Sequence, residues 1–138
     1  MKRPEPSALY HYSCHHGASA IGERGIVLPS GMHAPEAVER MPEELKWLTN
    51  YAWFTDLSQP LPGQLGLTRM LIDCDRLAHR FVVKPDEMEK CIWWPDEMKR
   101  LNLRAARRIS LAPGAMPAHW WVATGPIRAE GLPWVNAS

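Results

Sequence analysis

Short apolar runs separated by turn-forming residues open the chain. Residues 9–13 alternate apolar and polar side chains and are rich in β-forming types, which predicts a strand. Residues 15–24 carry apolar side chains at helical spacing and end before Gly25, a residue that favours the left-handed conformation just past a helix. The apolar run 26–28 then stops at Pro29 and predicts a second, short strand. The chain therefore begins with a strand–helix–strand unit.

The rest of the chain predicts more short elements. Its 13 prolines restrict helices to short pieces and favour strands, turns and loops, which indicates an α+β fold rather than a helical bundle. In chain order we expect helices over 34–40 and 42–48, a central strand over 51–55, a loop over 56–66, strands over 69–74 and 80–83 joined by a hairpin or a brief helical turn, a strand or helix entry over 91–94, a helix over 95–108, a strand over 119–124 and an edge strand over 127–135.

Length and charge limit what the chain can be. A chain of 138 residues fits one domain, which we place over 1–138 with flexible tails at 1–7 and 136–138. The formal net charge of +1 excludes an overall field that would attract nucleic acid or an acidic membrane, although local basic clusters remain. No apolar run approaches the roughly 20 residues that span a bilayer, so no membrane association is expected. The sequence does not indicate an oligomeric state.

Cysteine usage and the N-terminal residues predict a cellular compartment. The three cysteines are odd in number and lack C-x-x-C spacing, which argues against a disulfide framework and against a zinc site. The basic residues at the start are not followed by the apolar segment of a signal peptide. We therefore expect a reduced, cytoplasmic protein.

Histidines near the start of the chain are the first candidates for chemistry. His11, His15 and His16 lie around Cys14 without the H-E-x-x-H spacing that places two metal ligands on one helix face. We therefore expect no metal ion and interpret His15 and His16 as solvated. Cys14 has the helix-start setting that can lower a thiol pKa. Because no nucleophile motif accompanies it, we interpret it as a core residue.

Aromatic side chains are the second candidates. Seven tryptophans are many for this length. Five of them, with one tyrosine and one phenylalanine, could line a cleft that stacks a nicotinamide, an adenine or another base. These residues are Tyr12, Trp53, Phe54, Trp93, Trp94, Trp120 and Trp121. Neighbouring residues on a strand point to opposite faces, so we expect one member of each tryptophan pair in the core. The other member is either covered or exposed to a partner. The two pairs are Trp93-Trp94 and Trp120-Trp121.

Two groups of basic residues could bind a phosphate or pyrophosphate, because arginine offers a forked set of donors. One group lies between two predicted strands and the other at the end of a predicted helix. The first is the better candidate because it flanks the turn between buried strands, whereas arginines at a helix end are interpreted as solvated. The groups are Arg76, His79 and Arg80, and Arg104, Arg107 and Arg108.

The stretches 9–13 and 25–29, with the helix that contains Ala20 and Ile21 between them, form a strand, a helix and a return of the G-L-x-P kind. This order resembles the opening of the ADP-ribosyltransferase-like families, including the RNA 2′-phosphotransferases that share their fold. The strand at 51–56 resembles their second motif strand, where a hydroxyl or aromatic residue lines the nicotinamide pocket. The resemblance covers roughly the first half of the chain. It implies small, strongly bent antiparallel sheets that form a cleft, two or three short helices, and NAD as substrate.

The resemblance also implies roles for particular residues. His11 would hydrogen-bond the ribose on the nicotinamide side. Many members place a catalytic glutamate on a late strand, but the strand predicted over 119–124 has none, and Glu130 is the only acidic residue after it. A phosphotransferase of this fold would not need that glutamate. The implied catalytic residues are His11, Thr55 and Glu130, and the implied cofactor-binding residues are Tyr12, Ser13, Tyr51, Trp53, Arg76, His79 and Arg80.

Three functions compete at this point. The leading hypothesis is a small transferase that cleaves NAD and moves ADP-ribose to a protein or nucleic-acid acceptor. The second is a non-enzymatic protein-binding module, such as an inhibitor, that uses exposed tryptophans as anchors. The third is the binding of a nucleotide or a nucleic-acid end in a pocket of aromatic and arginine side chains. The near-zero net charge argues against broad duplex binding but leaves room for a single-nucleotide pocket.

Overall fold

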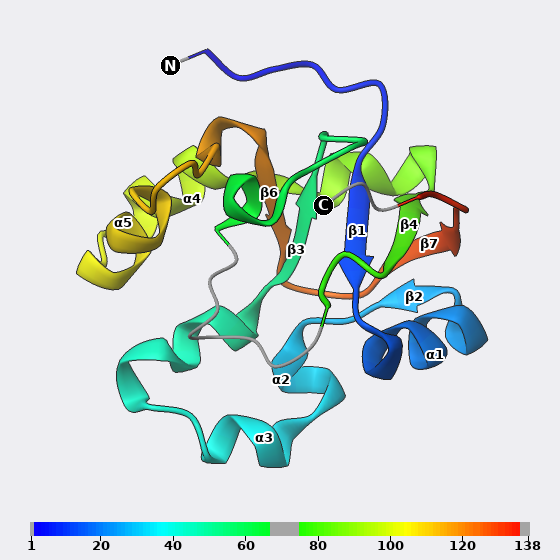
Figure 1. Cartoon of the computed structure of the whole chain (residues 1–138). Coiled ribbons are helices and arrows are strands. Elements are labelled where there is room, and N and C mark those ends of the chain that lie inside the picture. The colour runs from blue at the N-terminus through cyan, green and yellow to red at the C-terminus, as the bar shows by residue number, and fades with distance from the viewer. Residues whose placement is uncertain (1, 67–74, 136–138) are drawn as a thin grey trace.

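A curled antiparallel sheet of seven strands forms the centre of the protein (Figure 1). The structure is a computed structural model and describes residues 2–66 and 75–135. The strand order is β2-β7-β4-β1-β3-β6-β5, and neighbouring strands are antiparallel. The strands are β1 (Tyr10–Ser13), β2 (Ile26–Val27), β3 (Ala52–Thr55), β4 (His79–Val83), β5 (Ile92–Trp93), β6 (Trp120–Ala123) and β7 (Ile127–Gly131).

Short helices surround the sheet, which confirms the predicted α+β class. Helix α1 packs beside β2, and α4 and α5 lie together near β6 (Figure 1). Several helices have a proline in the first turn, where its missing N–H has no helical partner to lose. The α-helices are α1 (His15–Arg24), α2 (Ser30–His33), α3 (Pro35–Glu39), α4 (Trp94–Leu101) and α5 (Arg104–Ser110). The 3-10 helices are η1 (Glu43–Asn50), η2 (Pro62–Leu65), η3 (Pro85–Lys90) and η4 (Pro117–His119).

Both faces of the sheet are covered by apolar side chains. Trp121 pairs with Phe54 on β3 and with Trp93 on β5, and these three rings belong to the larger core cluster. Its neighbour Trp120 points to the opposite face and packs in a second cluster with Trp94. All four paired tryptophans are therefore buried. The predicted alternation of faces is confirmed, and the second member of each pair is covered by helices rather than exposed.

The opening unit has the predicted form. Strand β1, helix α1 and strand β2 follow one another, and Gly25 ends α1 with a φ of 67°. Its N–H donates to the carbonyl of Ile21 at 2.8 Å. The left-handed backbone at this position turns the chain sharply, so that β2 can pair with β7.

Two predictions about the second half are wrong. The helix expected over 95–108 is interrupted, because Asn102 adopts a φ of 49° and ends α4 before α5 begins. Asparagine tolerates this left-handed conformation better than most residues. The strand expected at the edge, over 127–135, is shorter and lies between β2 and β4, so the edges are β2 and β5. The strand predicted over 69–74 lies outside the described residues.

No helix in the described parts of the chain combines the length and the apolar character needed to cross a bilayer.

Replacing Gly25 with alanine should lower the free energy of unfolding by about 1 to 2 kcal/mol, because a Cβ disfavours the left-handed conformation. The matched control is Gly22→Ala in the same helix. Gly22 is exposed, and a Cβ there would meet nothing within 4 Å. This control should raise stability by about 0.5 to 1 kcal/mol. Urea denaturation measures both values. A Gly25→Ala protein as stable as the wild type would contradict the assigned role of this residue.

Candidate functional site

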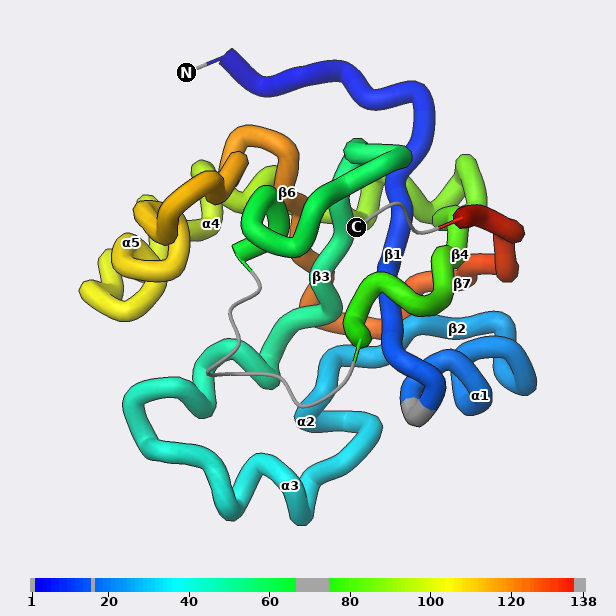
Figure 2. Tube along the Cα trace, viewed as in Figure 1, coloured from blue at the N-terminus to red at the C-terminus, as the bar shows by residue number. Residues whose placement is uncertain are grey.

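A cavity opens where β1 and β3 separate. The two strands are paired through Tyr10 and Thr55, and from there β1 runs towards Ser13 while β3 is entered from Ala52. The chain between β2 and β3, over 28–51, leaves the sheet as a long arm and returns to it (Figure 2). Residues of this arm, of both strands and of α1 enclose a space of about 660 Å³. Pockets for small ligands in proteins are typically of about this size.

His11 lies in the wall of this cavity. Its Nδ1 is 2.7 Å from the carbonyl oxygen of Trp53, and a carbonyl can only accept, so Nδ1 carries the hydrogen and donates it. No other hydrogen bond to the ring is formed within the described residues, so Nε2 keeps its lone pair. The imidazole of His11 also contacts the ring of Phe54, with the ring centres 5.6 Å apart.

The surroundings of His11 favour its neutral form. Burial lowers the pKa of His11 below its ordinary value of 6.5, and the hydrogen bond to Trp53 opposes this only in part. The positive charge of Arg76 lowers the pKa further. At neutral pH the cavity therefore contains an uncharged imidazole with an acceptor nitrogen, held in a fixed orientation by β3.

Aromatic side chains form one wall of the cavity. Tyr51, Trp53 and Trp120 line it. The ring of Trp53 contacts those of Tyr51 and Trp120 at centre distances of 5.9 and 6.4 Å, and it packs on Trp94 behind the wall at 4.8 Å. Trp94 is fully buried. The wall is thus braced from behind, and its half-buried member, Trp53, is the ring with most surface left for a planar ligand, since Tyr51 and Trp120 are buried.

A buried carboxylate, which pairs with an exposed arginine, positions Tyr51 in this wall. The hydroxyl of Tyr51 donates to Oε2 of Glu97 at 2.7 Å, and Arg100 binds both carboxylate oxygens of Glu97 at 2.7 and 2.8 Å. Burial raises the pKa of Tyr51 to about 12. The guanidinium of Arg100 lowers the pKa of Glu97, so the network contains a neutral phenol and an ionised carboxylate at neutral pH.

The charge in the lining is positive. Arg24 at the end of α1 and Arg76 in the turn before β4 both line the cavity, as does His33 from α2. Among the described residues, the lining includes no aspartate or glutamate. The arginines would therefore balance the negative charge of an anionic ligand, whereas the described lining has no carboxylate to balance a cationic one.

Two predicted hydroxyl residues line the cavity but are already hydrogen-bonded. Ser13 is buried, and its hydroxyl donates to the carbonyl of Cys14 at 3.2 Å. A Cβ on Gly17 would lie 2.4 Å from this oxygen, so α1 passes close to the Ser13 hydroxyl, which would have to move if a larger residue stood there. Thr55 donates to the carbonyl of His119 at 2.7 Å and accepts from the N–H of Leu57 at 3.1 Å.

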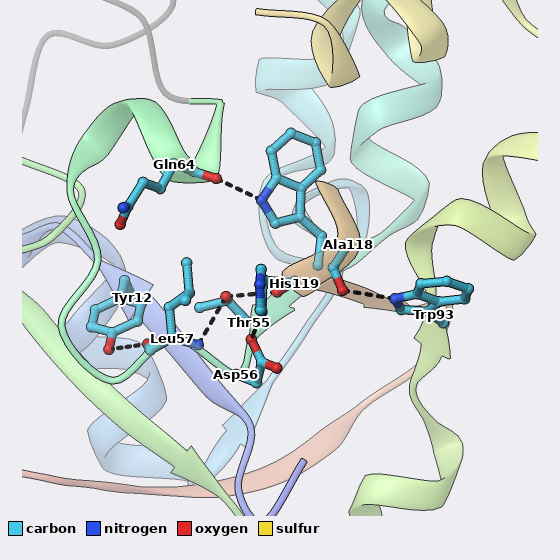
Figure 3. Close-up of polar contacts among 9 residues, drawn as sticks. Tyr12, Thr55, Asp56, Leu57, Gln64, Trp93, Ala118 and His119 are labelled. Atoms are coloured by element: carbon cyan, nitrogen blue, oxygen red, sulfur yellow. Dashed lines mark hydrogen bonds and ion pairs between the residues drawn. The ribbon is translucent and has the colours of Figure 1, made fainter. Parts of the chain in front are cut away.

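Figure 3 shows that these bonds of Thr55 belong to a set that fixes the loop after β3. Asp56 accepts from Nδ1 of His119 at 2.7 Å, and the hydroxyl of Tyr12 donates to the carbonyl of Leu57 at 2.8 Å. Burial raises the pKa of Tyr12 to about 12, so this donor stays protonated. The loop is therefore tied to β1 and to η4, just before β6. The single hydroxyl hydrogen of Thr55 is used in the bond to the carbonyl of His119.

The structure separates the first basic group. Arg76 lines the cavity, but His79 and Arg80 do not. Arg80 lies opposite Tyr12 in the register of β1 and β4, and it donates to the carbonyls of Ser58 and Pro133 at 2.9 and 2.8 Å. His79 hydrogen-bonds to His15 at 2.6 Å.

Glu130 lies on β7, away from the cavity lining. Its carboxylate pairs with Lys84 at 2.9 Å, and 63% of its side chain is exposed. Of the ten residues selected from the sequence, seven line the cavity and three do not. The seven are His11, Tyr12, Ser13, Tyr51, Trp53, Thr55 and Arg76; the other three are His79, Arg80 and Glu130.

Sequence reasoning did not select Arg24 or His33, which also line the cavity. Arg24 occupies the last turn of α1, where a basic residue also complements the helix dipole, so its position gave no separate signal. His33 belongs to the arm, whose path depends on contacts between α2 and η1 that are far from β1 in the sequence.

Within residues 2–66 and 75–135, no three His, Cys, Asp or Glu side chains gather closely enough to bind a metal ion. Comparisons with protein-family models, with curated proteins and with solved structures found no match.

Replacing Glu97 with glutamine should lower the free energy of unfolding at neutral pH by about 1 to 3 kcal/mol, because charged hydrogen bonds to Arg100 and Tyr51 are lost. The pKa of Glu97 is lowered on folding, so its stabilisation is present above its ordinary value of 4.5 and lost as the pH falls below it. The difference in stability between wild type and variant should therefore shrink below pH 4.5.

The matched control is Glu89→Gln, an exposed residue with no ion pair in the described parts of the chain. It should leave the urea midpoint almost unchanged at every pH. A Glu97→Gln protein with the same pH profile as the wild type would show that the buried carboxylate is not what stabilises this wall.

Proposed function

We propose that the cavity binds NAD and that the protein transfers ADP-ribose from it to a macromolecular acceptor, with His11 contacting the ribose next to the nicotinamide. The observation that carries this proposal is the neutral His11, which lines a cavity with aromatic walls and positive charge and whose Nε2 makes no hydrogen bond within the described residues.

The properties of the lining support a dinucleotide as the ligand class. Flat aromatic walls suit planar bases, and Trp53 presents a ring that is held on both sides. Arg24 and Arg76 supply two positive charges, which suit a pyrophosphate. The lack of carboxylates among the described lining residues removes the repulsion that a phosphate would otherwise meet.

The orientation of His11 suits a ribose hydroxyl. Because Nδ1 donates to Trp53, Nε2 is the ring atom that can accept a hydrogen bond from the ligand. Accepting from a ribose hydroxyl would fix the sugar beside the aromatic wall. A protonated imidazole could not accept this bond, so the lowered pKa of His11 keeps the site competent at neutral pH.

The transfer itself requires one bond to break and one to form. The bond between C1′ of the ribose and the nicotinamide nitrogen breaks, and its electron pair stays with the departing nicotinamide. The sugar carries positive charge in the transition state, which the aromatic faces of Tyr51 and Trp53 can stabilise. An acceptor atom then bonds to C1′ and releases its proton to water. Glu130 has no part in this scheme, because it lies outside the lining.

The alternative function, a non-enzymatic module that binds another protein, requires tryptophan side chains exposed at the surface as anchors. All seven tryptophans are described, and each is buried or partly buried. The enclosed cavity therefore supports ligand binding better than a flat aromatic interface.

His11→Asn should abolish most of the transfer while keeping the fold. The asparagine amide can still donate to the carbonyl of Trp53, but it lacks the acceptor that Nε2 provides. We expect at least about tenfold less labelled ADP-ribose transferred, because one hydrogen bond to the ligand is lost. The comparison variant is His15→Asn, which changes a histidine outside the cavity lining. Equal labelling by wild type and His11→Asn would overturn the role of His11.

Arg76→Gln should weaken NAD binding about fivefold to tenfold, because a charged donor to the pyrophosphate is removed. Arg40→Gln is the matched control, since Arg40 is also exposed but does not line the cavity. Isothermal titration calorimetry gives both dissociation constants. If the two variants bind NAD with the same affinity, Arg76 does not contact the phosphates.

A further inference from the structure

A basic face lies next to the mouth of the cavity. Three arginines on α5 are exposed, and they line a groove of about 860 Å³ together with Leu111 and Pro113. Gly66 and Ile109 line both this groove and the His11 cavity, so the two lie side by side. We call Arg104, Arg107 and Arg108 the α5 arginine face.

Within residues 2–66 and 75–135, these arginines form no ion pair. No carboxylate of the described residues lies within 4 Å of any of them. The only side-chain hydrogen bond of the group within the described chain is from Arg107 to Asn102, at 3.2 Å. The whole chain has a net charge of only +1. Three positive charges on two turns of helix, with no ion pair to the described residues, therefore form a concentrated patch.

Helix stability alone does not explain the face. Arg107 and Arg108 lie in the last turn of α5, where cations complement the negative end of the helix dipole. Arg104 is the first residue of α5, at the positive end, and no acidic residue of that turn offsets it. A cation placed there opposes the dipole, so the dipole does not account for all three arginines.

The chemistry of the groove fits a nucleic-acid strand. Residues three and four apart on a helix have Cβ atoms about 5 to 6 Å apart, so the face presents closely spaced forked donors to successive phosphates. Leu111, with 82% of its surface exposed, adds an apolar contact for a base. Beyond Gly66 and Ile109, the aromatic wall can receive a flat base from the same strand. An acidic peptide would use the arginines but not the wall.

We infer that the α5 arginine face binds a single-stranded nucleic acid and directs it into the cavity as the acceptor, an inference that rests on the proposed function. A single strand fits better than a duplex, because an unpaired base can enter the cavity at no unpairing cost. The near-zero net charge of the chain also gives no broad field for a duplex.

The test compares two triple variants of the full chain. The first replaces the α5 arginine face by glutamine (Arg104→Gln, Arg107→Gln, Arg108→Gln). The control replaces three other exposed cations without ion pairs in the described residues. These are Arg3→Gln, Arg40→Gln and Lys99→Gln. Both variants lose the same charge, so a difference between them reports position rather than net charge.

Fluorescence anisotropy with a short labelled single-stranded oligonucleotide measures binding over a range of salt concentrations. The face variant should bind at least about tenfold more weakly at low salt, and its slope of log affinity against log salt should fall by about 2, since each phosphate contact to a single strand contributes roughly 0.7. The control should stay within about twofold of the wild type. No binding by the wild type, equal losses in both variants, or equally tight binding of a polyglutamate peptide would overturn the inference.

Two further readouts separate this inference from the proposed function. NAD should raise the melting temperature of the wild type and of both triple variants alike, because the changed residues lie outside the NAD cavity. Binding of the oligonucleotide through the α5 arginine face without any NAD shift would refute the proposed function and leave the binding surface supported. An NAD shift with labelled transfer to protein but never to the oligonucleotide would overturn the inference and leave the proposed function standing.

Discussion

The hydrogen bond from His11 to the carbonyl of Trp53 connects β1 to β3 at the point where the two strands separate. At Tyr10 and Thr55 the strands are still paired through the backbone. Beyond that point a side chain, rather than the next ladder bond, reaches across from β1 to β3. The cavity exists because the strands separate here, and the bridging imidazole is the group that faces it. The residue that bridges β1 and β3 is therefore also the residue that we propose to contact the ligand.

The surrounding contacts keep this arrangement rigid. Trp53 is braced by Trp94 and Trp120, and Tyr51 is held by the buried carboxylate of Glu97, which pairs with Arg100. The loop after β3 is tied down through Thr55. A wall fixed in this way needs no reordering when a ligand binds, which lowers the entropic cost of binding. Arginine side chains give a positive charge to the cavity and to the α5 arginine face beside it.

Local signals in the sequence predicted the elements that depend on local causes. Gly25 marks the end of α1 because a left-handed residue was required there, and β1 shows the alternation of a strand. The break at Asn102 was missed, because asparagine is only a weak signal compared with glycine or proline. The alternation of side chains along a strand predicted that Trp120 and Trp121 lie on opposite faces of the sheet. The helices that cover the face of Trp120 could not be predicted, because they are brought there by contacts between residues distant in sequence.

Part of the candidate site could be predicted from the sequence. Residues on β1 and β3 could be grouped because both strands resembled motif strands and lie side by side. Arg80 and Glu130 could not be placed from the sequence. Their orientation depends on the register of β4 with β1 and on the position of β7, which only the assembled sheet defines.

The state of the His11 ring is the point on which the proposed chemistry depends most directly. Nitrogen-15 NMR of the labelled imidazoles distinguishes the two neutral tautomers from the charged form. At neutral pH His11 should carry its hydrogen on Nδ1, with a bare Nε2 whose chemical shift changes when NAD is added. A hydrogen on Nε2, a charged ring at neutral pH, or an Nε2 signal that does not respond to NAD would contradict the role assigned to His11.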